Sequence, residues 1–300
     1  MLNTSRFIMQ KERQAMRYCF LRFPQGKFKA VTLSYDDGVC ADLRLAEILD
    51  RYGIKCTFNI NSGFFGGKGK TTPEEIKTHI LDKGHEVAVH GEKHIAPGIA
   101  APNILIADVL NCRRALEEQF GMIIRGMAYP DSGITRMHNG NSYEVIRRSL
   151  QSLGIVYART LGGDNNRFHL PEDFYAWMPT AHHKNPLLME YASDFVRLRE
   201  ESLYSANRFP RLFYLWGHSY EFDRDNNWPL VEEFCQVISN KEDTWYATNM
   251  EIYDYVMAYR ALVTSADGKW VYNPTLIDVW MNVDGKLFCI LSGQTVTIEE

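Results

Sequence analysis

The stretch Val31-Thr32-Leu33-Ser34-Tyr35-Asp36-Asp37-Gly38 is an apolar run that ends in two adjacent carboxylates and a glycine. Such a run predicts a buried strand. A second segment, His90-Gly91-Glu92-Lys93-His94, follows the apolar run Val87-Ala88-Val89 and carries two imidazoles four residues apart. One carboxylate and two imidazoles make three protein ligands, the number that a catalytic zinc-type site uses while one position stays open for water. The second carboxylate would then be the base that deprotonates this water.

Each of these motifs, taken alone, has a structural explanation. Asp and Gly are common turn residues, and nine histidines in 300 residues make a chance HxxxH pair unsurprising. However, two side-by-side carboxylates behind an apolar strand cost free energy unless a cation compensates them. One helical turn would also aim His90 and His94 at the same point. The motifs together favour a two-histidine, one-carboxylate site, whereas spacing does not identify its metal. His85 is expected to be structural.

Strand and helix patterns alternate along most of the chain. Strands are predicted at 16–23, 28–35, 55–60, 86–89, 126–128, 156–160, 174–178, 211–216 and 244–247. Helices are predicted up to Gly53 and at 72–83, 102–120, 142–153, 186–203, 229–239 and 249–263. Such alternation predicts a parallel sheet, and this many units predict its closure into a barrel. The motif residues fall just after strand ends, on the catalytic face of such barrels.

The two ends of the chain follow different patterns. Residues 1–27 are predicted to be an N-terminal arm and the first strand of a hairpin, with its turn at 24–27, and residues 28–264 to be the barrel. Residues 265–300 predict a small β appendage with strands at 269–272, 277–283, 286–291 and 295–298 and a hairpin turn at Asp284-Gly285. We find no internal repeat and no low-complexity linker.

Composition narrows the class of protein. With 45% hydrophobic and 23% charged residues, the chain resembles a soluble globular protein with a substantial core. A net charge of -4 provides no basic surface for nucleic acid. An aromatic content of 13% suits a sugar-binding surface and a large core equally well.

Six cysteines lie singly in apolar or helical contexts without CxxC spacing, so buried free thiols are expected. The N-terminus has no apolar core of signal-peptide length, and no run is long enough to span a membrane. These features predict a cytoplasmic protein without a membrane partner, although a sequence from which a leader has been removed would look the same.

The segments Tyr35–Gly38 and His90–His94 resemble, in sequence, order and separation, the first two motifs of the polysaccharide deacetylase (NodB-homology, carbohydrate esterase family 4) domain. The resemblance covers roughly residues 28 to 260 and implies an α/β fold, a distorted (β/α) barrel. It also implies that Asp37, His90 and His94 bind a divalent metal, most often Zn²⁺. Asp36 would then be the general base.

A third motif of the family, Arg-x-Pro-x-Gly, is similar to Ala128-Tyr129-Pro130-Asp131 followed by Ser132-Gly133. The resemblance implies that the backbone N–H of Asp131 helps to hold the oxyanion. It also places Tyr129 and Pro130 beside the substrate. Ala128 replaces the arginine that many members use to fix the base, which leaves the orientation and the pKa of Asp36 unexplained.

The family's last motif, Leu-x-His after a strand, is similar to Leu215-Trp216-Gly217-His218, with tryptophan in the leucine position. The resemblance implies that His218 is the general acid and that Trp216 contacts substrate. A histidine in this position without the family context would be structural. The segment 219–221 is a further candidate for the lining of the site.

Two other segments have weaker parallels. Trp177, within 173–177, corresponds to the family's aromatic pocket wall, but its spacing from Asp173 differs from the usual acid-tryptophan pattern. Trp177 as a core residue and Asp173 as a solvated loop acid are the alternatives. His182 and His183 match no family motif. Neighbours on a strand point to opposite sides, so at most one of them is expected to face the site.

The residues together with the resemblance imply a metal-dependent hydrolase that removes acetyl groups from an N- or O-acetylated carbohydrate. One alternative is a C–N hydrolase that uses the same site on a cyclic amide. Another is a catalytically silent carbohydrate-binding protein, against which the complete ligand set and the retained Asp36 and His218 argue. The sequence leaves the sugar, the linkage, the native metal and the oligomeric state open.

Overall fold

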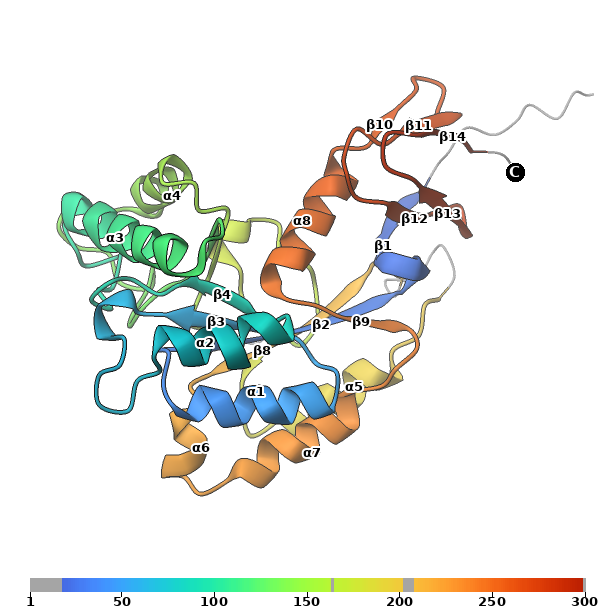
Figure 1. Ribbon diagram of the computed structural model, residues 1–300. Helices are drawn as coiled ribbons and strands as arrows, with labels where there is room; N and C mark the ends of the chain where they lie inside the picture. The colour runs from blue at the N-terminus through green and yellow to red at the C-terminus, as the bar shows by residue number, and fades with distance from the viewer. Residues whose placement is uncertain (1–17, 163–164, 202–207, 299–300) are drawn as a thin grey trace, which may run out of the picture.

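A parallel β-sheet lies at the centre of the molecule, and helices pack against it (Figure 1). The computed structural model describes residues 18–162, 165–201 and 208–298. The strands are β1 (Cys19–Arg22), β2 (Lys29–Asp36), β3 (Cys56–Ile60), β4 (Glu86–Val89), β5 (Gly126–Ala128), β6 (Tyr157–Arg159), β7 (Ala181–His182), β8 (Arg211–Gly217), β9 (Thr244–Tyr246), β10 (Val263–Thr264), β11 (Trp270–Tyr272), β12 (Val279–Val283), β13 (Lys286–Ile290) and β14 (Thr295–Thr297).

The α-helices are α1 (Ala41–Arg51), α2 (Pro73–His79), α3 (Pro102–Phe120), α4 (Tyr143–Ser152), α5 (Leu188–Arg197), α6 (Tyr220–Arg224), α7 (Trp228–Ile238) and α8 (Asn249–Arg260). Short 3₁₀ helices are η1 (Pro24–Gly26), η2 (Ser62–Phe64), η3 (Leu81–Lys83) and η4 (Phe174–Ala176). The predicted start of α2 is confirmed, because Thr72 caps this helix in a reciprocal capping box with Glu75. The predicted helix 186–203 is shorter, and residues 202–203 lie outside the described residues.

The main sheet has the strand order β6-β5-β4-β3-β2-β8-β7, and β9 pairs with the start of β2. Every pairing in it is parallel, so the carboxyl ends of these strands meet at one edge. The sheet is curled into a half-barrel, which confirms the predicted α/β fold, a distorted (β/α) barrel.

The segment 177–182 spans the gap between β6 and β8. Trp177 bridges to Arg159 of β6, whereas Ala181 and His182 pair with β8. The strand predicted at 174–178 is wrong. Residues 174–176 form η4, because the Asp173 side chain accepts a hydrogen bond from the Tyr175 N–H and turns the chain. The barrel is therefore distorted at the segment 177–182, where β6 and β8 are joined irregularly.

Successive side chains of β2 point alternately into two hydrophobic cores. Val31, Leu33 and Tyr35 pack with residues of α1, α2, α3, α4, α5 and α7 in one cluster. Ala30 belongs to a second cluster, which contains residues of α8 on the other side of the sheet (Figure 1). Successive strand residues point to opposite faces. Asp36 consequently shares the α8 face with Ala30, inside the curl of the sheet.

A polar network of the half-buried Glu86 and the buried Thr57 and Tyr157 lies on this inner face, where α8 begins. Glu86 accepts hydrogen bonds from Tyr157 Oη at 2.6 Å, Thr57 Oγ1 at 2.8 Å and Met250 N at 2.9 Å. The Asn249 N–H donates to Thr57 Oγ1 at 3.0 Å, which ties the start of α8 to β3. Burial raises the pKa of Glu86 to about 7, although these hydrogen bonds act in the opposite direction.

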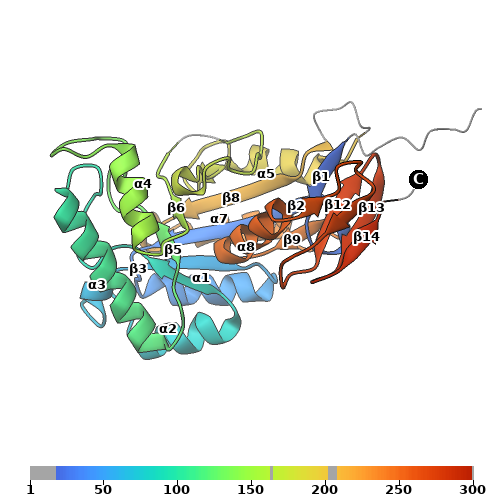
Figure 2. The same cartoon turned by 90° about the horizontal axis from the view of Figure 1, so that it is seen from above.

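The C-terminal strands form two small sheets at the end of the molecule opposite α3 and α4 (Figures 1 and 2). The predicted hairpin at Asp284-Gly285 is confirmed by pairing of β12 with β13, and β11 pairs with β10 and β14. β1 was predicted to pair with the following strand, but it pairs antiparallel with β12. The limits of the arm and appendage, at residues 27 and 264, remain predictions, and residues 1–17 lie outside the described residues.

All six cysteines are described and are free thiols, as expected. Cys56, Cys112 and Cys235 are buried, whereas the predicted burial is wrong for Cys40, which is exposed, and for the partly exposed Cys19 and Cys289. His85 is buried, accepts a hydrogen bond from the Cys56 N–H at 3.1 Å and lies 3.3 Å from Asp50 Oδ1, which agrees with its predicted structural role. Among the helices in the described ranges, none is both long and apolar enough to cross a membrane.

Glu86 provides a test of the fold through the pH dependence of stability. Below pH 4.5 both the folded and the unfolded state hold its proton. As the pH rises to about 7, the unfolded state releases the proton while the folded state keeps it, so the free energy of unfolding falls. Above that pH the contribution is constant. The decrease in the free energy of unfolding that is attributable to Glu86 is about 3 kcal/mol.

We therefore expect Glu86→Gln to become more stable, relative to the parent chain, between pH 4.5 and pH 7.5. Urea unfolding at several pH values measures this difference. Glu74→Gln, on the exposed first turn of α2, is the control and should follow the parent curve. Parallel curves for Glu86→Gln and the parent chain would contradict the expectation.

Candidate active site

Asp36 is the last residue of β2, and its side chain is fully buried. Asn59 Nδ2 donates to its Oδ1 at 2.8 Å, and Arg159 Nη2 donates to its Oδ2. Burial alone would raise the pKa of Asp36, but the charges of Arg159, His90 and His218 outweigh it and hold the pKa below its ordinary value. Asp36 is thus a buried, ionised carboxylate that is held on both oxygens.

Arg159 supplies the guanidinium that is missing at position 128, where alanine replaces the expected arginine. Ala128 and Arg159 are direct cross-strand neighbours on β5 and β6, so the arginine comes from one strand further along the sheet. It is fully buried, and its guanidinium lies 4.3 Å from the centre of the Trp216 ring. Sequence reasoning missed Arg159. The available clue was a charged residue inside the short strand predicted at 156–160.

Asp37, His90 and His94 come together beyond the ends of β2 and β4. Asp37 Oδ1 lies 3.6 Å from His90 Nε2 and 3.4 Å from His94 Nε2. Neighbouring ligands of tetrahedral zinc lie about 3.3–3.5 Å apart. The His90 side chain is buried, whereas those of Asp37 and His94 are 17% and 34% exposed, which leaves one side of the cluster open. The three predicted ligands are therefore close enough to bind one ion.

The hydrogen bond of His90 tests whether this cluster fits a metal. Its Nδ1 lies 2.9 Å from the carbonyl oxygen of Ala128. Because a carbonyl only accepts, Nδ1 carries the hydrogen and Nε2 keeps a free lone pair. Nε2 is buried and has no hydrogen-bond partner among the described residues. A backbone carbonyl that fixes the tautomer in this way is the usual outer support of a metal-bound histidine.

His90 and His94 lie on a loop, so the expected helical turn is wrong. Asp108 of α3 holds this loop by accepting the Lys93 N–H at 2.7 Å. A side chain on Gly91, which has φ +78°, would place its Cβ 2.3 Å from Asp108 Oδ2. His94 itself has φ +58°. Left-handed backbone at a non-glycine residue persists where its surroundings enforce it, as at many functional sites.

The Tyr129–Gly133 turn follows β5. Asp131 is exposed with φ +47°, and the Gly133 N–H donates to the Pro130 carbonyl at 2.9 Å. Tyr129 is fully buried, and its hydroxyl donates to the Tyr175 carbonyl at 2.8 Å. Pro130 is buried as well. Of the predicted residues in this turn, Asp131 is the one that reaches solvent.

His218 follows β8, which pairs with β2 in a register that puts Gly217 beside Tyr35. Asp36, Asp37 and His218 therefore leave neighbouring strand ends. The His218 side chain is 22% exposed, and its Nδ1 lies 3.6 Å from Glu221 Oε2. Trp216 is only 7% exposed and packs against Arg159 and His182.

Both histidines of the His182-His183 pair approach the same carboxylate, contrary to expectation. Their Nε2 atoms each lie 3.2 Å from Glu221 Oε2. His183 fits between Tyr35 and Phe222, in space that a side chain on Gly217 would fill. Two strand neighbours reach one point because β7 ends at His182.

Burial lowers the pKa of His182 to about 4, and the neighbouring His183 adds to this effect. Burial would raise the pKa of Glu221, but His183, His182 and His218 outweigh it, so this pKa is below its ordinary value. At neutral pH the cluster therefore contains an ionised Glu221 beside a neutral His182.

Trp177 pairs with Arg159 through the backbone, but the contacts of its side chain and of Asp173 are with other residues. Trp177 is fully buried and packs edge-on against Tyr157, Phe174 and Tyr214, as expected of a core residue. Asp173 caps η4 and accepts a hydrogen bond from the Tyr143 hydroxyl. We do not assign either residue a substrate contact.

Residues 23–156 match a family model described as polysaccharide deacetylase. A structure from Mycobacterium smegmatis, provisionally described as a polysaccharide deacetylase, aligns with 82% of this chain and 96% of its own, with 19% identity and a TM-score of 0.55. At that identity it shows the fold alone.

Two further structures align with this chain at 14% identity. A family 4 carbohydrate esterase from Streptomyces lividans, solved with acetate, covers 70% of this chain and 87% of its own, with a TM-score of 0.44. A family 4 acetyl xylan esterase from Clostridium thermocellum, solved with a cobalt ion, covers 75% and 90%, with a TM-score of 0.45. No curated protein matches this chain significantly.

The family match contains the segments around Asp36, His90 and Asp131, whereas His218 lies beyond it. The predicted resemblance is confirmed by this match and by the curled parallel sheet. Over residues 23–156, a little less than half of the chain, the sequence is thus similar to the polysaccharide deacetylase (NodB-homology) family.

Proposed function

We propose that this chain is a divalent-metal-dependent deacetylase that hydrolyses the acetyl group of an N- or O-acetylated carbohydrate. The match of residues 23–156 to the polysaccharide deacetylase family model supports deacetylase activity. The observation that carries the finer proposal is the ionised, buried Asp36 beside three metal-type ligands, with His218 on the adjacent strand end. In this proposal Asp36 is the base, the three ligands form the cation site, and His218 is the acid, all at one edge of the sheet.

Asp37, His90 and His94 would hold the metal, for which Zn²⁺ is our choice because two imidazoles and one carboxylate suit it. When bound, a divalent ion supplies Lewis-acid chemistry, since it polarises a carbonyl oxygen and acidifies water. Asp37 and His94 are partly exposed, so substrate and water can approach from their side.

Asp36 would take a proton from the water that attacks the acetyl carbon, and the backbone N–H of Asp131 would donate to the oxyanion. The C–N or C–O bond then breaks, and His218 would give its proton to the leaving nitrogen or oxygen. Acetate and a free amine or hydroxyl are the products.

Replacement of Asp36 by asparagine should remove the base while the three proposed ligands stay in place. We expect the rate of acetate release from acetylated chito-oligosaccharide or acetylated xylan to fall by about 100-fold or more. Bound zinc should remain as in the parent chain. Asp223→Asn, which alters the acceptor of the Trp228 Nε1–H bond, is the matched control.

Full activity of Asp36→Asn would exclude it as the base. No acetate release by the zinc-loaded parent chain on any acetylated sugar would contradict the proposed deacetylase function. The cyclic-amide hydrolase or the silent binding protein would then be favoured.

Removal of an imidazole from the proposed ligand set should remove the metal. We expect His90→Ala to lose zinc and acetate release together, because the buried Nε2 is the ligand that solvent cannot replace. Elemental analysis after dialysis measures the zinc content. Retention of zinc by His90→Ala at the level of the parent chain would show that the metal binds elsewhere.

Replacement of Arg159 by methionine should leave Asp36 as a buried charge without its cation. Loss of one partner of a buried ion pair costs about 3–5 kcal/mol. We expect Arg159→Met to unfold at lower urea, and the double variant with Asp36→Asn to recover much of that loss. Additive effects of the two substitutions would contradict the pairing.

A further inference from the structure

Two clusters of the described residues have the same donor set of two imidazoles and one carboxylate. One is the proposed metal site, and the other contains His182, His218 and Glu221. In both, the donor atoms lie within 4.8 Å of one another. The separations also agree, since Glu221 Oε2 lies 3.2 Å from His182 Nε2 and 3.6 Å from His218 Nδ1. Composition and distance alone would therefore assign a metal to each cluster.

The two clusters differ in the backbone group that faces the Nδ1 atom of a histidine. His182 Nδ1 accepts a hydrogen bond from the Lys184 N–H at 3.1 Å. A neutral imidazole whose Nδ1 accepts must carry its hydrogen on Nε2. The Nε2 that faces Glu221 is therefore an N–H donor, whereas His90 faces a carbonyl and presents a lone pair. The second cluster has a proton where a metal ligand needs an electron pair.

Glu221 lies at the centre of this cluster. Its side chain is nine-tenths buried, and its Oε1 lies 3.4 Å from Lys184 Nζ and 3.1 Å from Arg224 Nη2. Its Oε2 faces the nitrogens of His182, His183 and His218. Oε2 and His218 Nδ1 are buried and have no hydrogen bond of ordinary geometry in the described part of the chain. Catalytic hydrogen bonds in unliganded structures are often long and tighten when substrate binds.

We propose that His182 and Glu221 are positioning residues for His218, and that this cluster is a hydrogen-bonded chain rather than a second metal site. The His182 Nε2–H fixes Glu221 Oε2, which accepts the Nδ1–H of His218. This contact leaves His218 Nε2 to carry the proton for the leaving group. The role of His218 rests on the proposed deacetylase function, whereas the tautomers of the two rings do not.

Substrates with different leaving groups test the positioning role. An N-acetylated sugar needs a proton on its leaving nitrogen, whereas para-nitrophenyl acetate leaves as a stable phenolate. We expect His182→Leu and Glu221→Gln to lower kcat on acetylated chito-oligosaccharide about 10- to 100-fold, as losses of outer-shell partners do. We expect KM, zinc content and the rate on para-nitrophenyl acetate to change less than twofold.

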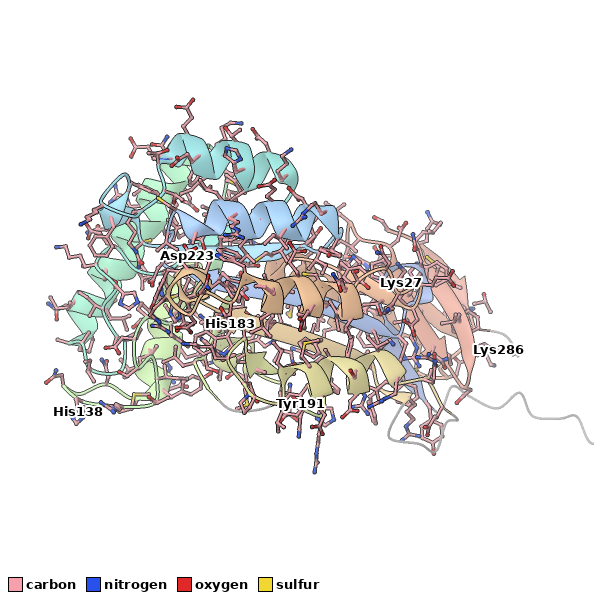
Figure 3. The ribbon with its side chains drawn as sticks, turned by 90° about the horizontal axis from the view of Figure 1, so that it is seen from below. Lys27, His138, His183, Tyr191, Asp223 and Lys286 are labelled. Carbon is pink, nitrogen blue, oxygen red and sulfur yellow. The ribbon has the colours of Figure 1, made fainter. Side chains whose placement is uncertain are left out.

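His138→Leu is the control, because His138 is exposed at one edge of the molecule, apart from His183 (Figure 3). Equal losses on both substrates would indicate general damage and overturn the proposal, as would an unchanged kcat. Loss of a bound zinc equivalent in His182→Leu would identify a second metal site instead.

Long-range ¹H–¹⁵N spectra of the histidine rings test the same proposal without turnover. We expect the Nε2–H tautomer for His182 and the Nδ1–H tautomer for neutral His218, and we expect Glu221→Gln to change the latter. The Nδ1–H tautomer in His182 would overturn the proposal even if the enzyme is active. Conversely, an inactive parent chain with the expected tautomers would contradict the proposed function alone.

Discussion

The site depends on the ion pair between Asp36 and Arg159. Both side chains are completely buried, so an ionised Asp36 requires a cation within the same interior. The guanidinium comes from β6, crosses the curl of the sheet and stacks on Trp216 of β8. A single charge-compensating contact thus joins three strands and keeps the proposed base ionised beside the proposed metal ligands.

The two histidine-carboxylate clusters show how the backbone assigns chemistry to identical side chains. A carbonyl opposite Nδ1 of His90 leaves its Nε2 available to a metal. An amide opposite Nδ1 of His182 makes its Nε2 a proton donor. These backbone contacts therefore divide one end of the sheet between the proposed metal site and the proposed proton-donor site. Both support the chemistry that the proposed hydrolysis needs.

The sequence predicts those parts of the structure that are local. The strand before Asp36, the capped helix at Thr72 and the hairpin at Asp284-Gly285 each carry their determinants within a few residues. The proposed ligand set Asp37, His90 and His94 could be named because these residues resemble the family motifs in spacing, although the loop conformation of His94 could not be predicted.

The parts that sequence reasoning missed depend on contacts across the fold. Arg159 replaces a side chain absent from Ala128 because the two residues are neighbours on adjacent strands, which no local pattern reveals. β1 pairs with β12, more than 250 residues away. His182 and His183 reach one carboxylate because the chain turns where β7 ends, an irregularity that strand alternation does not anticipate.

The most direct test of this account is a crystal structure of the zinc-soaked chain, with anomalous diffraction measured on both sides of the zinc absorption edge. The account predicts a strong anomalous peak bonded to Asp37, His90 Nε2 and His94 Nε2, and no peak between His182, His218 and Glu221. A peak at the second cluster, or an empty first cluster in zinc-saturated protein, would contradict it.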